Sequence, residues 1–125
     1  MKKLIYCLIL VLITCCIIIR DVNAQTAITY GQTIQSNIST QGEIDTYTFT
    51  GSTNDIVTVL LSGNFSYYGT TQLELYSPTG TLLKRVSGQY SSRIDSLSLQ
   101  VNGLYTILVM DNDGQQTGNY GLSIQ

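Results

Sequence analysis

The chain has 125 residues and a formal net charge of −2, with no histidine and no tryptophan. This length accommodates one domain of ordinary size and a targeting segment. The absence of histidine removes the usual general base of serine and cysteine hydrolases. Only six lysine and arginine residues are present, too few for the clustered positive charge of a nucleic-acid-binding protein.

Residues 1–24 have the layout of a secretory signal peptide. Lys2 and Lys3 supply the positive start, an apolar run of 16 residues follows, and Val22-Asn23-Ala24 forms a small-residue cleavage site. A membrane anchor is disfavoured because a spanning helix needs about 20 apolar residues. A lipoprotein signal is a weaker alternative, since the apolar run continues past the cysteines. We expect cleavage before Gln25 and export, to the periplasm or the extracellular space.

The remaining domain, residues 25–125, has a composition that argues against catalysis. All three cysteines lie before position 25, so the exported chain has neither a disulfide nor a thiolate nucleophile. It keeps seven acidic and three basic residues, a net charge of −4. A serine–lysine pair would depend on Lys84, which we interpret as a solvated guard of an edge strand. A glycosidase needs two carboxylates on either side of its cleft, and the spacing of the seven acids in the sequence does not single out such a pair. We therefore expect no enzyme activity and no required cofactor.

Short segments that alternate apolar and polar residues predict most of the strands in this domain, and a nearly continuous apolar run at 56–61 predicts a buried central strand. Positions 28–38 predict one or two edge strands around Gly31. The further strands are expected at 46–50, 56–61, 73–76, 81–86, 97–101, 105–109 and 120–124. Ser77-Pro78-Thr79-Gly80 predicts a turn between two of them. Asn102-Gly103, flanked by two alternating runs, predicts a two-residue hairpin.

This pattern predicts an all-β fold, a two-sheet antiparallel β-sandwich that is jelly-roll-like. No segment has helical periodicity, and turn signals recur about every 8–12 residues. The inward faces of the strands should form the core. The expected core residues are Tyr47, Phe49, Val57, Val59, Leu61, Leu73, Leu75, Leu99, Tyr105, Ile107, Val109, Tyr120 and Leu122.

Four ordered segments give the domain a family resemblance. They match the patterns G-E-x-D-x-Y-x-F, L-x-L-Y-x-x-x-G, G-x-Y-x-I-x-V and G-x-Y-x-L-x-I at residues 42–49, 73–80, 103–109 and 118–124. In order and spacing they resemble the bacterial pre-peptidase C-terminal domain. The resemblance implies a jelly-roll-like accessory domain of secreted peptidases or other exported enzymes, sometimes removed on maturation and without catalysis. It also makes a secreted peptidase a candidate partner.

Aromatic residues in predicted loops are the candidate ligand-binding residues. Phe65, Tyr67, Tyr68 and Tyr90 could stack on a sugar or cover a peptide, because aromatic side chains combine contact area with a polar tip. The alternative is that two or three of them cover the ends of the sandwich as part of its core. The absence of tryptophan weakens the case for sugar.

Acidic residues provide a candidate metal site and a candidate turn residue. Asp111 and Asp113 stand at alternate positions of a glycine-containing loop and could bind calcium, although the EF-hand template fails further along. The alternative is a solvated loop whose acids cap turns. Asp45 is expected to accept hydrogen bonds from backbone amides in its turn.

Together these features predict a secreted, non-catalytic accessory or binding module that acts on an extracellular protein or polysaccharide. The alternative is a structural or cell-surface subunit that pairs with a partner by its edge strands. An exposed cluster of loop tyrosines would favour the first function. An unguarded first or last strand would favour the second.

Overall fold

The computed structural model describes residues 25–66 and 69–125. The predicted signal peptide and the predicted ligand residues Tyr67 and Tyr68 therefore lie outside the described residues. Within the two described ranges, no helix is long and apolar enough to cross a membrane.

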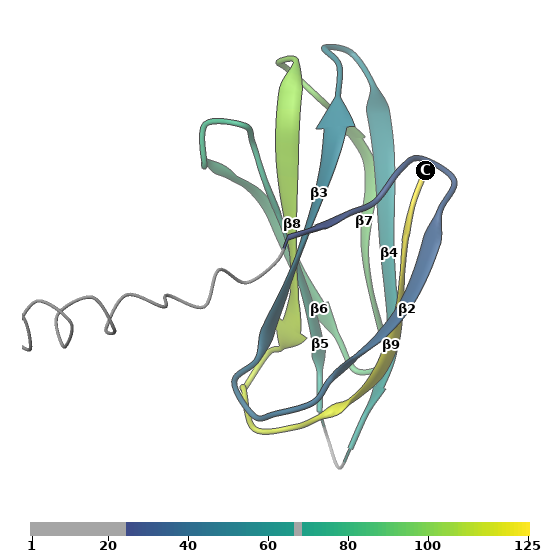
Figure 1. Cartoon of the computed structure of the whole chain (residues 1–125), viewed down its shortest axis with the longest axis vertical. Coiled ribbons are helices and arrows are strands. Elements are labelled where there is room, and N and C mark those ends of the chain that lie inside the picture. Colours follow the sequence, from purple (N-terminus) through teal and green to yellow (C-terminus); the bar gives the residue numbers. More distant parts are fainter. Residues whose placement is uncertain (1–24, 67–68) are drawn as a thin grey trace, which may run out of the picture.

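The described residues form nine strands. Figure 1 shows that they are arranged in two layers. The five-stranded sheet has the order β1 (Thr26–Ala27), β3 (Ile44–Gly51), β8 (Gly103–Asp111), β5 (Thr71–Tyr76) and β6 (Leu82–Gly88). The four-stranded sheet has the order β2 (Thr33–Ile38), β9 (Gly118–Ile124), β4 (Ile56–Phe65) and β7 (Ser91–Ser98). All neighbours are antiparallel except β1 and β3, which are parallel. The predicted all-β, two-sheet sandwich is confirmed.

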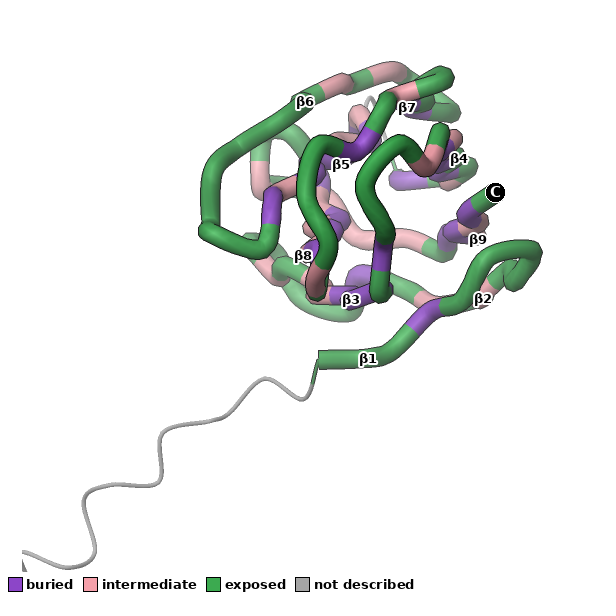
Figure 2. Tube along the Cα trace, turned by 90° about the horizontal axis from the view of Figure 1, so that it is seen from above, coloured by how far each residue is buried: buried purple, intermediate pink, exposed green. Residues whose placement is uncertain are grey.

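The core lies between the two sheets, where alternate residues of each strand meet. All thirteen predicted core residues are buried, and Figure 2 shows the buried positions along the strands. Full burial of an aliphatic side chain contributes about 1.5–3 kcal/mol, so these inward faces supply the main stabilisation. Five further apolar residues are also buried: Ile28, Ile38, Phe65, Ile94 and Ile124.

The predicted turn at residues 77–80 is confirmed. The Gly80 amide donates to the Ser77 carbonyl at 2.9 Å, and Gly80 has a φ of 81°, which is the left-handed conformation that glycine adopts without strain. The strands on either side, β5 and β6, pair antiparallel. This hairpin forms one edge of the five-stranded sheet.

The predicted hairpin at Asn102-Gly103 is wrong, because the strands before and after it belong to different sheets. The chain leaves the four-stranded sheet after Ser98, and buried Leu99 turns into the core. The Tyr105 hydroxyl then donates to the Val101 carbonyl at 2.7 Å. A tyrosine that bonds back to the backbone a few residues upstream stabilises such crossings between the sheets of a sandwich.

Candidate functional site

The two acids predicted to bind calcium have different surroundings. Asp111 is buried, at 4% exposure, and its carboxylate accepts from the amides of Thr70, Gln115 and Gln116 at 2.9–3.1 Å. Asp113 is exposed and accepts from the side-chain amide of Asn112. The described residues contain no cluster of three His, Cys, Asp or Glu side chains placed to hold a metal. Calcium binding therefore stays a prediction, and an ion at Asp111 would have to displace backbone donors.

The structure does not assemble the predicted aromatic site from its described members. Phe65 is only 5% exposed and packs in the core, which fits the alternative of a residue that covers one end of the sandwich, and a ligand-binding role for Phe65 stays a prediction. Tyr90 is 64% exposed in the turn between β6 and β7. Its carbonyl accepts from the Gly63 amide at 2.9 Å, which anchors the turn to β4. Tyr90 alone, among the described candidates, is available to a ligand.

Asp45 differs from its predicted role as an acceptor for turn amides. Its carboxylate accepts a hydrogen bond from the Tyr120 hydroxyl, and the hydroxyls of Tyr47 and Tyr120 are 2.6 Å apart. Since Tyr120 donates to Asp45, Tyr47 donates to Tyr120. Glu43 is the acid that accepts from the turn amides, those of Ser39 and Thr40.

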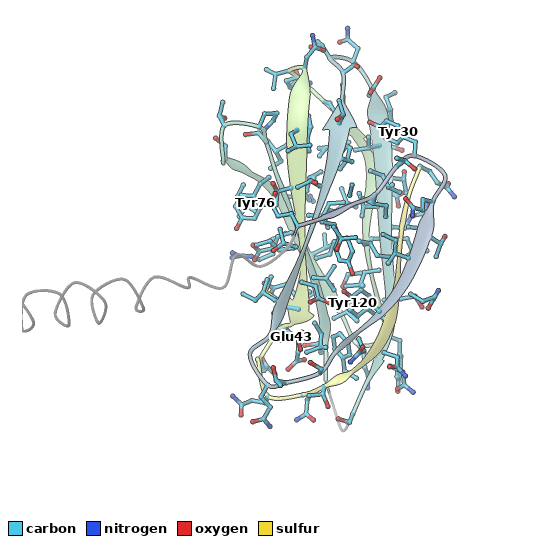
Figure 3. The ribbon with its side chains drawn as sticks, viewed as in Figure 1. Tyr30, Glu43, Tyr76 and Tyr120 are labelled. Atoms are coloured by element: carbon cyan, nitrogen blue, oxygen red, sulfur yellow. The ribbon has the colours of Figure 1, made fainter. Side chains whose placement is uncertain are left out.

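This Asp45–Tyr120–Tyr47 network joins the two sheets, because β3 and β9 lie in different layers. Figure 3 shows Tyr120 between the layers. Burial raises the pKa of Asp45, although the Tyr120 hydrogen bond opposes that shift. Burial and the bond to Asp45 raise the pKa of Tyr120. The network is a structural connection, and its polar atoms satisfy one another inside the sandwich.

The outer face of the five-stranded sheet contains a buried carboxylate. Leu73 and Leu75 point into the core, so Glu74 between them points outward, yet it is only 4% exposed. Three side chains cover it and donate to its oxygens: Gln72 at 2.8 Å, Tyr76 at 2.6 Å and Arg85 at 2.6 Å. Burial raises the pKa of Glu74, but the hydrogen bonds from Tyr76 and Arg85 outweigh it and lower the pKa.

Glu74 fixes the two side chains that project beyond it. Arg85 uses its Nε atom for the ion pair, and its side chain remains 56% exposed. The Tyr76 hydroxyl is held at the other carboxylate oxygen, and Figure 3 shows the ring on the outside of the sandwich. Arg85 of β6 is the partner of Glu74 on one side of β5, and Leu108 of β8 is its partner on the other side. A guanidinium, an aromatic ring and a leucine are thus placed side by side in defined positions.

An apolar hollow of about 430 Å³ continues this surface, lined by Tyr76, Pro78, Leu104 and Leu108 among others. Leu104 is 53% exposed and also borders a second hollow of about 200 Å³ beside Tyr30. We call the surface formed by Tyr76, Pro78, Arg85, Leu104 and Leu108 the Leu104 face. It is the best-defined candidate site of the described chain. Sequence reasoning missed this site. The signal that could have found it is Glu74, an acid between two core leucines, together with the basic pair Lys84-Arg85 on the next strand.

Comparison with known proteins shows the class of fold. No family model and no curated protein matches the sequence. Among solved structures, the pre-peptidase C-terminal domain of a collagenase from Bacillus anthracis is similar, with a TM-score of 0.67 and 16% identity over 81% of this chain and 94% of that chain. PliG from Salmonella Typhimurium, a periplasmic inhibitor of g-type lysozyme, has a TM-score of 0.52 and 18% identity over 81% and 96%.

At such low identity these likenesses show a shared fold. The resemblance to the pre-peptidase C-terminal domain, expected from four sequence segments, is confirmed by the collagenase domain. The segments 42–49, 73–80 and 103–109 lie on β3, β5 and β8 of the five-stranded sheet, and the segment 118–124 is β9 of the other sheet.

Proposed function

We propose that the protein is exported and acts as a non-catalytic accessory module that binds an extracellular protein through the Leu104 face. The observation that carries this proposal is the fixation of Tyr76 and Arg85 on buried Glu74, beside an apolar hollow. Tyrosine and arginine are enriched among the residues that dominate binding energy. Side chains already held in place lose less conformational entropy on binding, which favours affinity.

The surface chemistry supports a protein partner more than a polysaccharide. Exposed Leu104, and exposed Leu82, which pairs with Tyr76 at the edge of the same sheet, add apolar area to this surface. Apolar patches of this kind mark protein interfaces. A sugar-binding platform would favour several exposed aromatic rings, whereas the Leu104 face offers Tyr76 alone. We therefore rank a polysaccharide below a protein as the partner. A secreted peptidase is one candidate for that protein partner.

Two observations support a role without catalysis. The exported chain would have neither histidine nor cysteine. Its two buried acids, Glu74 and Asp111, and the half-buried Asp45 are each engaged by hydrogen bonds within the domain. A general acid or base must instead be within reach of a substrate proton.

Strand pairing through β2 is the alternative function. This six-residue edge strand of the four-stranded sheet contains no charged residue or proline and pairs with β9 in unbroken register. By contrast, β6 at the edge of the other sheet carries Lys84 and Arg85, and its register shifts opposite Leu75 and Tyr76. Charges and bulges protect edge strands from pairing with other chains, so β2 is the less protected edge.

A binding panel with matched variants tests the proposed function. Residues 25–125 are tested for binding to collagen, g-type lysozyme, chitin and cellulose, the first two chosen from the functions of the proteins with the same fold. Leu104→Asp places a charge on the proposed face, while Leu60→Asp places one on the outer face of the four-stranded sheet. We expect a protein probe to bind, with affinity reduced at least about tenfold by Leu104→Asp alone. Binding that survives Leu104→Asp, or no binding to any probe, would contradict the proposal.

A further inference from the structure

We infer that the exported protein begins with a pyroglutamyl residue formed from Gln25, which borders the Leu104 face. This inference rests on the export step of the proposed function, because signal cleavage before Gln25 makes this glutamine the first residue. Gln25 is exposed and precedes β1, so it belongs to no strand. It lines the same hollow as Tyr76, Pro78 and Leu104.

The cyclisation needs no reagent beyond the residue itself. The free α-amino nitrogen attacks the side-chain amide carbon of Gln25 and forms a five-membered lactam. The bond from that carbon to the amide nitrogen breaks, a proton passes from the amine to the leaving nitrogen, and one ammonia is released. An α-amine has a pKa of about 7.7–8.0, so a substantial fraction is uncharged and nucleophilic near neutral pH.

The surroundings of Gln25 suit a neutral terminus. The residues that line the hollow include no carboxylate to pair with an ammonium group. The nearest acid along β5, Glu74, is already paired with Arg85. Cyclisation removes the terminal charge and leaves a compact amide ring at the edge of the apolar surface. The lactam would therefore be part of the surface that a partner meets.

The fold also predicts how accessible this ring is. Thr26 and Ala27 pair with Tyr47 and Thr48 of β3, and the Ile28 amide donates to the Thr48 carbonyl at 2.9 Å. An aminopeptidase must draw the terminal residues into its own active site. The folded chain holds them on β3, so removal of the ring requires local opening of β1.

The experiment is to express the full chain for export in a bacterial host and to measure the mass of the recovered protein and of its N-terminal peptide. The result expected is residues 25–125 less one ammonia, resistant to sequential N-terminal degradation. Gln25→Glu is the matched control, because its carboxylate is a poor electrophile and the amine should stay free. A cleaved protein that keeps a free amine on Gln25 would overturn cyclisation while export stands. An uncleaved chain, or cleavage elsewhere, would overturn both.

A second measurement tests the structural part of the inference. Pyroglutamyl aminopeptidase should remove the ring from the folded protein at least about tenfold more slowly than from the heat-unfolded protein, because β1 must open first. Equal rates in the two states would contradict the placement of the terminus on β3.

Discussion

At the scale of single residues, Tyr120 connects the two sheets through hydrogen bonds to Asp45 and Tyr47. Tyr120→Phe should lower the free energy of unfolding by about 1–3 kcal/mol, because it leaves a partly buried carboxylate without its donor. Denaturant unfolding measures this loss. Tyr30→Phe is the control, since it removes an exposed hydroxyl that bonds to Asp55 at 3.2 Å. An equal effect of the two variants would argue against the buried network.

Glu74 makes the stability of the domain depend on pH. Its pKa is lower in the folded state, so its stabilisation is present above about pH 4.3, the unfolded value, and is lost as pH falls through the folded pKa. Asp45, whose pKa is raised, acts in the opposite sense, because its contribution falls as pH rises through its folded pKa. Glu74→Gln should flatten the acid side of the stability profile.

Thermal unfolding between acid and neutral pH checks this prediction. The matched control is Asp95→Asn, which removes a surface carboxylate paired with Arg93. Such exposed pairs contribute little to stability. An acid limb that stays as steep in Glu74→Gln as in the wild type would show that Glu74 does not carry the pH dependence.

At the scale of the elements, the crossing from β7 to β8 depends on Tyr105. Tyr105→Phe should cost about 1 kcal/mol, because it removes the hydrogen bond to the Val101 carbonyl while the ring keeps its stacking on Phe49. Equilibrium unfolding of the variant tests this. Unchanged stability would mean that buried Leu99 alone holds the crossing.

The same crossing shows what local patterns can predict. Alternation places Tyr47, Ile107 and Leu122 in the core correctly, because the side-chain period of a strand is a local property. Asn102-Gly103 has the signature of a hairpin, but the sheet that each flanking strand joins depends on partners that are distant in sequence. The partner of β7 is β4, and the partners of β8 are β3 and β5. The start of β7 at Ser91 was missed because its one buried apolar residue, Ile94, stands among polar residues.

At the scale of the whole molecule, the candidate site was the least predictable feature. Glu74 and Arg85 are eleven residues apart in sequence and become neighbours only through the register of β5 and β6. Leu104 joins them from β8, on the other side of β5. Outward residues of a strand resemble any solvated face until this pairing is known. The loop tyrosines were easier to single out because aromatic residues stand apart in a polar loop.

The most direct test of the Leu104 face is a nuclear magnetic resonance titration of residues 25–125 with the protein probe that binds in the panel. We predict that the perturbed backbone amides gather on the five-stranded sheet, at residues 74–76, 82–85 and 104–108. Perturbation centred on Tyr90 and on residues 65–70 would instead support the predicted aromatic site. Perturbation along residues 33–38 would support pairing through β2. Either of those results would contradict the Leu104 face as the binding surface.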